Sequence, residues 1–204
     1  MAERTAEKIR KTKETEISLK LNLDGTGKSR IKTGIGLLDH MLELFAFHGL
    51  FDLEIEAKGD LEVDIHHTNE DIGIVLGQVF KQALGDKKGI KRFGSASVPM
   101  EGVLAKVTVD ISGRGHFKGG LDSAVTTDED EKYSKKYFDH FWESFAKQSG
   151  INLIIEEVKC FDVTTPDIHT LLEPIFKALG LALRQAVEID PRRKDVPSTK
   201  GIID

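Results

Sequence analysis

Four of the seven histidines stand at equivalent places in two similar stretches of the chain. They are His40 and His66 in the first stretch, and His140 and His169 in the second. In each stretch the later histidine is followed four residues on by a glutamate, Glu70 or Glu173. Residues four apart share one face of a helix, so each pair could offer an imidazole nitrogen and a carboxylate to one ion. That donor set suits Mn, Fe, Co or Zn, whereas Mg and Ca prefer oxygen ligands alone. The spacing therefore predicts a transition-metal centre.

His67 directly follows His66 and complicates this picture. On a helix of about 3.6 residues per turn the two rings would point roughly 100° apart. Adjacent histidines therefore bind one ion together only with difficulty, and the simpler arrangement sends them to two different ions. Each ion would be completed from elsewhere in the fold, with His40 and His140 as natural contributors. Because Cys160 is the only cysteine, neither an internal disulfide nor a structural zinc site of thiolates is expected.

Basic and hydroxyl-bearing residues could hold an anionic substrate near such a metal. The candidates are Arg92, Arg114, Lys177 and the segment 197–201 (PSTKG). Arginine, lysine and serine side chains suit a phosphate group. Taken singly, each of these positions is better explained as an ordinary surface residue than as a ligand of the phosphate.

The histidines belong to a longer internal repeat. Residues 39–46 line up with 139–146, and residues 64–70 line up with 167–173, in the same order and at similar separations. Such self-similarity indicates a duplicated half-domain. The chain is therefore expected to hold one α+β repeat in residues 1–95 and a second in residues 96–204.

Hydrophobic periodicity predicts the elements that position these residues. Strands are expected at 17–23, 61–65, 98–115 and 151–155, with 29–33 returning after the turn at 24–27 as the second strand of a hairpin. Helices are expected around 37–48, 72–84, 139–148 and 170–188, and Thr68 with Asp71 resembles a capping pair for the second. Residues 112–132 are expected to form a polar loop. Hairpin-like strand pairs mixed with helices favour an α+β fold over a doubly wound parallel sheet.

The composition excludes several classes of function. A net charge of −5 and 7% aromatic residues give little support to nucleic-acid binding. No apolar run approaches the roughly 18 residues of a membrane span, and residues 1–12 contain no hydrophobic region of a signal peptide. A cytoplasmic protein without nucleic-acid or membrane partners is expected.

Nearly end to end, the sequence resembles the imidazoleglycerol-phosphate dehydratase family. The motifs that carry the resemblance are residues 12–15 (TKET), 21–27 (LNLDGTG), 33–42 (TGIGLLDHML), 48–52 (HGLFD), 66–71 (HHTNED), 88–94 (KGIKRFG), 110–114 (DISGR), 176–178 (FKA) and 197–201 (PSTKG). Motifs of this length in this order are highly specific.

The resemblance implies a fold and an activity. The fold is two tandem repeats like domain 2 of ribosomal protein S5, each a small sheet with helices packed on it, in a homo-oligomer that typically has 24 subunits. The activity is that of a metal-dependent hydro-lyase, converting imidazole glycerol phosphate to imidazole acetol phosphate in histidine biosynthesis. Two Mn²⁺ ions per site are implied, at contacts between subunits.

The resemblance also implies roles for individual residues. By position, the metal ligands are His40, His66, His67, Glu70, His140, His169 and Glu173. The substrate-binding positions are Glu14, His48, Arg92, Arg114, Lys177, Ser198 and Lys200. Glu14, Glu70 and Glu173 are the candidates for moving protons, and the residue types leave the choice among them open.

The second cluster departs from the family pattern. Thr170 stands where the pattern has a histidine, Pro174 follows Glu173, and the loop before His169 is longer. A threonine is a poor ligand for such ions, so one of the two metals is expected to bind weakly unless a water, Asp162, Asp167 or another subunit substitutes. Proline biases the preceding residue away from helical angles, which could turn Glu173 aside. The alternative functions are a metal-binding paralogue with lost or altered activity and a structural protein that keeps only the scaffold.

Overall fold

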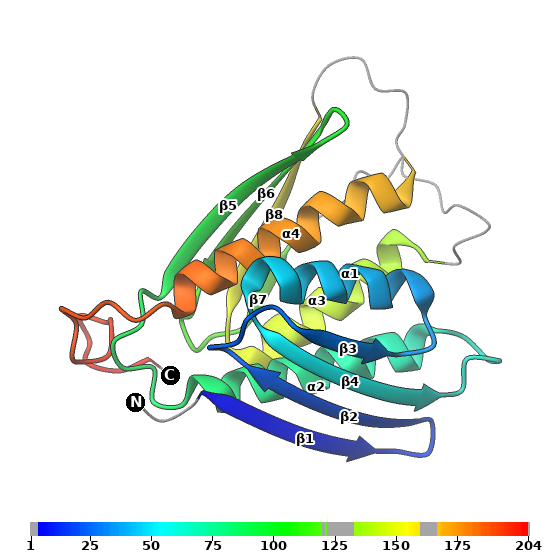
Figure 1. Cartoon of the computed structure of the whole chain (residues 1–204), viewed down its shortest axis with the longest axis horizontal. Helices are drawn as coiled ribbons and strands as arrows, with labels where there is room; N and C mark the ends of the chain where they lie inside the picture. Colours follow the sequence, from blue (N-terminus) through cyan, green and yellow to red (C-terminus); the bar gives the residue numbers. More distant parts are fainter. Residues whose placement is uncertain (1–3, 120, 122–132, 160–166, 204) are drawn as a thin grey trace.

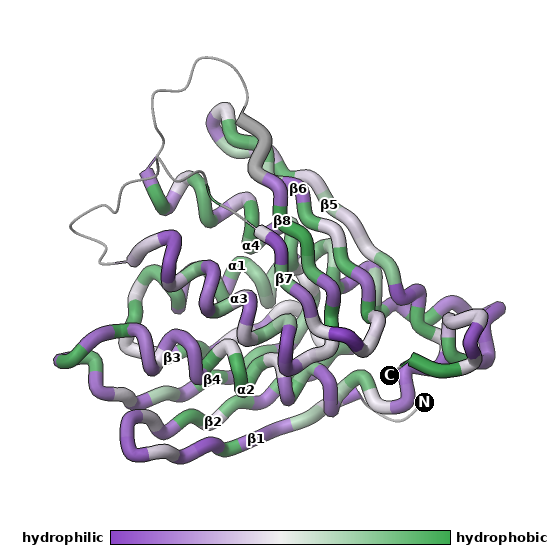
Figure 2. The backbone as a smooth tube through the Cα atoms, turned by 180° about the vertical axis from the view of Figure 1, so that it is seen from behind, coloured by the Kyte–Doolittle hydropathy of each residue, from purple (hydrophilic) through white to green (hydrophobic). Residues whose placement is uncertain are grey.

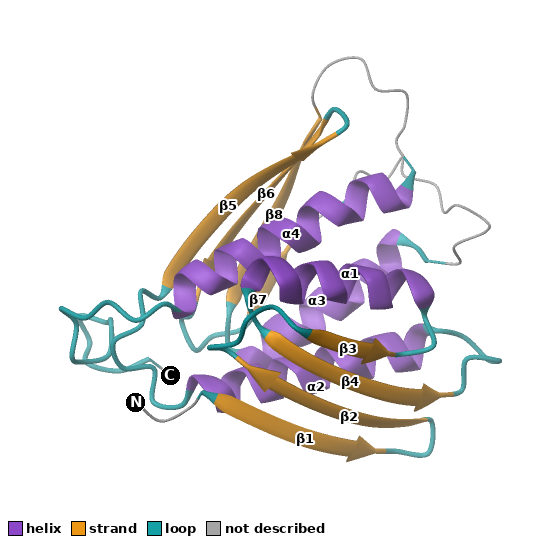
Figure 3. Ribbon diagram, viewed as in Figure 1, coloured by secondary structure: helices purple, strands orange, loops and turns teal. Residues whose placement is uncertain are grey.

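The structure is a computed structural model, and it describes residues 4–119, 121, 133–159 and 167–203. Cys160 and Asp162 lie outside these residues, as does most of the polar loop expected before residue 132. Figure 1 shows two sheets with the helices between them. In Figure 3 the helices are purple and the strands orange, so that the layers are easily distinguished.

The first half contains one four-stranded sheet and two helices. In chain order these elements are β1 (Thr5–Lys11), β2 (Thr15–Asn22), β3 (Ser29–Lys32), α1 (Gly36–Gly49), β4 (Asp52–Gly59) and α2 (His66–Leu84). The strands lie in the order β1-β2-β4-β3. β1 and β4 both pair with β2 in antiparallel fashion, and β3 pairs with β4 in parallel.

The second half repeats this plan. Its elements are β5 (Phe93–Met100), β6 (Val103–Asp110), β7 (His116–Lys118), α3 (Lys135–Ser149), β8 (Asn152–Lys159) and α4 (Ile168–Val187). The strand order is β5-β6-β8-β7, with the same pattern of antiparallel and parallel pairs. The predicted α+β fold with two similar halves is therefore confirmed. Since β5 begins at Phe93, the proposed division between residues 95 and 96 falls inside the first strand of the second sheet.

The helices of the two halves pack against each other in equivalent pairs, α2 with α3 and α1 with α4. A glycine permits each contact. A Cβ at Gly77 of α2 would lie 2.6 Å from the Phe145 carbonyl oxygen, and one at Gly180 of α4 would lie 2.5 Å from the Phe45 carbonyl oxygen. The two helix pairs therefore approach at matching points, as expected for halves related by an approximate two-fold axis.

Apolar side chains from both halves meet in the helical layer. Trp142 is fully buried, and its ring centroid lies 6.0 Å from Phe45 of α1 and 5.2 Å from Phe176 of α4. In Figure 2 hydrophobic and hydrophilic stretches alternate along strands and helices, since each element has one face toward this core. No helix in the described ranges combines the length and the hydropathy that a membrane crossing requires.

The predicted hairpin between residues 17–23 and 29–33 is wrong. Both edges of β2 are occupied by β1 and β4, and β3 lies beyond β4. The loop that follows β2 is held instead by Asp52, whose Oδ1 accepts the N–H groups of Thr26 and Lys28 at 2.7 and 3.1 Å. Because the loop is tied to the start of β4, it delivers β3 to the far edge of that strand.

Three further predictions of local structure need correction. The run 61–65 is a turn rather than a strand, since the N–H of Val63 donates to the Asp60 carbonyl at 2.8 Å. Thr68 does not cap α2, because the helix begins at His66 and Thr68 is buried inside it. The expected strand 98–115 is the end of β5, a turn and β6, and the strand ends at Asp110.

Candidate metal centre

The first cluster lies where α1 and α4 meet. His169 Nε2 lies 3.2 Å from Glu173 Oε2, and His40 Nε2 lies 4.0 Å from the same oxygen. The imidazoles of His40 and His169 are stacked, with centroids 5.1 Å apart. Within the described ranges, this is the one group of three histidine, cysteine or acidic residues with ligand atoms all within 4.8 Å of one another. Two imidazoles and a carboxylate converging in this way are suited to a divalent transition metal.

The second cluster lies where α2 and α3 meet and is the counterpart of the first. His66 Nε2 lies 3.5 Å from Glu70 Oε2, and the ring of His66 is 4.9 Å from the ring of His140. The Nδ1 atom of His66 is buried and has no hydrogen-bond partner in the described part of the chain. Each cluster thus takes one histidine from one half and a histidine with its glutamate from the other half.

The starts of α2 and α4 are built by aspartates at matching positions. Asp64 Oδ1 accepts the N–H of His66 at 3.0 Å and the hydroxyl of Tyr137 at 2.7 Å. Asp167 is the N-cap of α4, and its Oδ1 accepts the N–H of Thr170 at 2.7 Å. The aspartates therefore fix the helical turns on which His66 and His169 stand.

Glu173 and Lys177 form an ion pair at the edge of the first cluster. Lys177 Nζ lies 2.5 Å from Glu173 Oε1, while the other carboxylate oxygen faces His169. Burial raises the pKa of Glu173, but the hydrogen bonds and charges of Lys177 and His169 outweigh it and leave the pKa below its ordinary value. The carboxylate is therefore held in the anionic form that binds a cation.

His48, near the end of α1, lies within the electrostatic field of this cluster. Burial lowers the pKa of His48, and the charge of Lys177 lowers it further against the opposing effect of Glu173. His48 and Lys177, both predicted to bind substrate, are therefore close enough for the charge of Lys177 to act on His48.

His67 does not join the cluster of His66. Its ring lies at 70° to that of His66 with centroids 5.9 Å apart, and its Nδ1 faces Asp60 Oδ2 at 3.0 Å and Glu14 Oε2 at 4.0 Å. The hydrogen bond with Asp60 raises the pKa of His67 against burial, and the charges of Glu14 and other carboxylates add to the rise. The structure therefore places the adjacent histidines in two different surroundings.

The residues that are expected to depart from the family pattern have defined positions in the structure. Thr170 lies beside His169 on α4. Its N–H donates to Oδ1 of Asp167, and the Asp167 carboxylate thereby caps the helix. Pro174 is buried within α4, yet Glu173 still faces His169 and Lys177. The expectation that Pro174 could turn Glu173 aside is therefore wrong.

The predicted phosphate-binding residues fall into separate places. Arg92 makes a bidentate pair with Asp110 at 2.7 and 3.2 Å, and its Nη1 donates to the Pro197 carbonyl at 3.0 Å. Ser198 directly follows Pro197 and therefore lies next to Arg92. Its Oγ accepts the N–H of Lys200 at 3.2 Å, which keeps Lys200 in the same segment of the surface. Arg114 lies in the turn before β7, where its N–H donates to Ser112 Oγ.

Arg92 and the first cluster lie at opposite ends of α4. The N–H of Arg92 donates to the Ala186 carbonyl, seventeen residues after His169 on the same helix. At 1.5 Å per residue this separation is about 25 Å along the helix axis. Figure 1 shows the C-terminal segment at the α4 end away from α4's first turn.

Asp60, Asp64 and Tyr137 are site residues that the sequence reasoning missed. Asp60 and Asp64 lie just ahead of the His66-His67 pair, and a carboxylate close to metal-binding histidines in sequence is a usable signal. Tyr137 comes from the other half, and only the packing of α3 on α2 brings it to Asp64.

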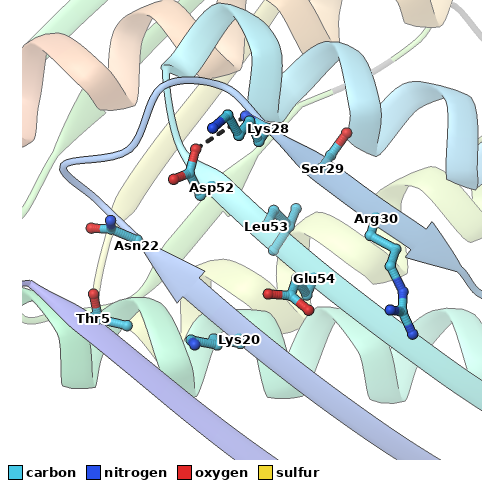
Figure 4. A pocket seen from close by; sticks show the side chains of 9 residues that line it. All are labelled: Thr5, Lys20, Asn22, Lys28, Ser29, Arg30, Asp52, Leu53 and Glu54. Atoms are coloured by element: carbon cyan, nitrogen blue, oxygen red, sulfur yellow. Dashed lines mark hydrogen bonds between the residues drawn. The ribbon is translucent and has the colours of Figure 1, made fainter.

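A hollow of about 420 Å³ lies on the outer face of the first sheet (Figure 4). Its polar lining includes Lys20, Lys28, Arg30 and Glu54, with the Lys28 N–H bound to Asp52. None of the predicted site residues lines this hollow. The two histidine–glutamate clusters lie instead at the helix contacts.

The fold and clusters define an α+β protein whose two similar halves join histidine and glutamate side chains suited to a divalent metal. The family model described as imidazoleglycerol-phosphate dehydratase matches residues 33–183. The chain belongs to the imidazoleglycerol-phosphate dehydratase family.

Similar proteins span the whole chain. It is 48% identical over 200 residues to the imidazoleglycerol-phosphate dehydratase of Bacillus pumilus, covering 98% of this chain and 100% of that protein. It is 50% identical over 203 residues to the enzyme of that name from Clostridium botulinum, covering both chains completely. The crystal structure of imidazoleglycerol-phosphate dehydratase from Staphylococcus aureus superposes with a TM-score of 0.78 at 32% identity, covering 91% of this chain and 99% of that one. The Pyrococcus furiosus protein in complex with (S)-C348 gives 0.78 at 35% identity, covering 96% and 99%.

Proposed function

We propose that the protein eliminates water from imidazole glycerol phosphate to give imidazole acetol phosphate, as a metal-dependent dehydratase of histidine biosynthesis. The observation that carries the proposal is the convergence of His40, His169 and Glu173 in a chain of this family. Its counterpart at His66, Glu70 and His140 supports a second ion. Mn²⁺ is the proposed metal, because imidazole and carboxylate donors suit it.

A metal bound to these residues would supply a Lewis acid that draws electron density from the imidazole ring of the substrate. His40, His169 and Glu173 would hold one ion, with Lys177 keeping the carboxylate anionic. His66, Glu70 and His140 would hold the other ion. Since Thr170 removes an imidazole beside His169, one ion is expected to bind more weakly.

Elimination also needs a group that takes a proton from carbon and one that protonates the leaving hydroxyl. Glu70 and Glu173 belong to the proposed metal-binding groups. Glu173 also faces both His169 and Lys177. Glu14 is therefore the remaining candidate for moving a proton. Glu14 is 56% exposed in its side chain. Its turn is held by Thr12, whose Oγ1 accepts the Glu14 N–H at 3.1 Å.

The substrate phosphate would bind Arg92, Arg114, Lys177, Ser198 and Lys200. Arg92 and the first cluster are about 25 Å apart along α4, so one chain does not bring all of these groups to one substrate. We therefore propose a homo-oligomer, of 24 subunits by family resemblance, in which neighbouring chains complete each site. The proposed location of this assembly is the cytoplasm. Light scattering would give a mass close to 24 times the 22.7 kDa of the chain.

The test is turnover of imidazole glycerol phosphate by protein that is stripped with a chelator and reloaded with Mn²⁺. Product formation should require the metal and fall by about a hundredfold or more in Glu173→Gln, as expected when a metal ligand is weakened. Glu43→Gln, which changes an exposed carboxylate on α1 near His40, should keep the wild-type rate.

Metal bound without turnover would instead support the paralogue of altered activity, for which Thr170 is the specific observation. Anomalous scattering at the histidines would count the ions. Failure of wild-type protein to bind any transition metal, with His66→Ala and Glu70→Ala changing nothing, would leave only the structural role.

A further inference from the structure

Asp60 occupies the junction between β4, the turn that carries Glu14, and the first turn of α2. Its N–H donates to the Glu14 carbonyl at 3.2 Å, and its own carbonyl accepts the N–H of Val63 at 2.8 Å. Backbone hydrogen bonds on both sides therefore fix where the Asp60 side chain begins.

Gly59 brings this junction directly onto α2. A Cβ at Gly59 would lie 1.9 Å from Thr68 Oγ1, so another residue would force the end of β4 away from the helix. Thr68 is adjacent to His67 in the same helical turn. The close approach is what allows a side chain at position 60 to reach His67.

The carboxylate of Asp60 faces His67 with both oxygens. Oδ2 lies 3.0 Å and Oδ1 3.3 Å from Nδ1, and in the described part of the chain the carboxylate makes no other hydrogen bond. A carboxylate oxygen accepts hydrogen bonds only, so Nδ1 must carry the proton. In the neutral ring the lone pair is then on Nε2, the atom on the opposite side of the imidazole.

We propose that Asp60 is a positioning residue, which selects the Nδ1–H tautomer of His67 and holds the ring so that Nε2 binds a divalent metal ion. This inference rests on the proposed metal-dependent function and adds to it a residue outside the predicted ligand set. Metal-binding histidines are commonly oriented by a carboxylate on the second nitrogen, and loss of that partner weakens metal binding by about 10–100-fold.

The contribution is confined to the first half of the chain. At the equivalent place in α4 stands Thr170, which has no imidazole to orient. The cluster of His40, His169 and Glu173 makes no contact with Asp60 in the described residues, so it should bind metal equally well with or without the Asp60 carboxylate.

The first measurement is metal affinity of the full-length protein, by competition of Mn²⁺ with a fluorescent chelator. Asp60→Ala should weaken binding at one class of site about 10–100-fold, and Asp60→Asn, which retains an acceptor oxygen, should restore part of it. Glu62→Ala removes a nearby exposed carboxylate and should match the wild type.

The second measurement is the tautomer of His67 in metal-free protein, by solid-state ¹⁵N NMR of histidine-labelled samples at a pH where the ring is neutral. The signals of His67 are those that disappear in His67→Gln. Wild-type protein should show a protonated Nδ1, and Asp60→Ala should shift the population toward a protonated Nε2.

Unchanged tautomer and unchanged affinity in Asp60→Ala would overturn the proposal. A loss of affinity that Asp60→Asn fails to relieve, with the wild-type tautomer retained, would also overturn it, because that result indicates a structural role only. Neither outcome touches the proposed function, which fails when wild-type protein binds no transition metal or when it binds metal and does not turn over substrate.

Discussion

Thr170 stands in the second repeat where the first repeat has His67, and its position limits what this difference affects. It is one residue beyond His169, which corresponds to about 100° around the helix. His40, His169 and Glu173 converge without it. The position of Thr170 matches that of His67, whose ring turns away from the cluster of His66. The threonine therefore leaves the cluster of its own helix intact, and we expect it to affect only a site on another side of the helix.

Thr170→His should supply an imidazole ligand at that site. We expect the weakest class of Mn²⁺ site to bind about tenfold more tightly, in line with the lower range for a group that supports a metal site. Chelator competition measures this change, and His169→Ala provides the contrast by weakening binding. No gain in affinity for Thr170→His would show that the threonine position does not face an ion.

At the residue scale, the sequence indicates which side chains bear chemistry but not how they pair. The duplicated motifs marked His40, His66, His140 and His169 as equivalent. That His40 pairs with His169, and His66 with His140, depends on α1 packing against α4 and α2 against α3. Contacts between residues more than seventy positions apart, such as His66 and His140, leave no local pattern in the sequence.

At the scale of elements, all four helices are predicted because each has a long apolar face, although α2 begins at His66 rather than near residue 72. β1 was missed for the opposite reason: Ala6 is its single buried residue, and Ile9 is 73% exposed. The error in placing β3 has a different cause. A turn signal predicts that the chain reverses direction, but it does not show that both edges of β2 are already paired with other strands. Sheet edges are therefore the part of this fold that periodicity describes least.

The contact between α1 and α4 offers a prediction at this scale. In Gly180→Ala the added Cβ would meet the Phe45 carbonyl oxygen at 2.5 Å and the Gly49 nitrogen at 2.8 Å, so the helices must separate. We expect a loss of about 1–3 kcal/mol in the free energy of unfolding. Because His40 and His169 lie on these helices, metal affinity should fall as well. Both quantities can be followed by chemical denaturation with and without Mn²⁺.

Gly36→Ala is the matched control, since a Cβ there meets nothing within 4 Å at the first position of α1. It should be neutral or stabilise slightly, by up to about 1 kcal/mol, because alanine favours the helix over glycine. Equal effects of the two substitutions would show that the close approach of α1 and α4 is not what Gly180 provides.

At the scale of the whole molecule, Arg4 joins the ends of the two halves. Its Nη2 lies 2.5 Å from Asp24 Oδ1 in the loop after β2, and its Nη1 donates to the Val187 carbonyl at 2.6 Å, where α4 ends. The side chain of Arg4 is 17% exposed. Because one guanidinium binds both Asp24 and the Val187 carbonyl, the ion pair with Asp24 also stabilises the contact with the end of α4.

This link predicts a specific dependence of stability on pH. The hydrogen bond from Arg4 lowers the pKa of Asp24 below its ordinary 3.8, although burial opposes the shift. A carboxyl with a lowered folded-state pKa contributes stability above the unfolded-state value and loses it as pH falls through the folded-state value. Asp24→Asn should therefore destabilise the protein by up to about 1 kcal/mol at pH 7, since half of this side chain is exposed and screened. The difference should shrink below pH 3.8.

Denaturation of both proteins at a series of pH values from 7 down to 3 measures this difference. Glu43→Gln removes one exposed carboxylate of α1 that has no contact with Arg4 among the described residues, and it should give a difference near zero throughout. If the gap between wild type and Asp24→Asn stays constant down to pH 3, the carboxylate does not act through Arg4. If it narrows as expected, the ion pair at the start of the chain contributes to holding the end of α4 in place. The same end of α4 contains Ala186, whose carbonyl accepts the N–H of Arg92, so the ion pair of Arg4 acts next to the position of Arg92.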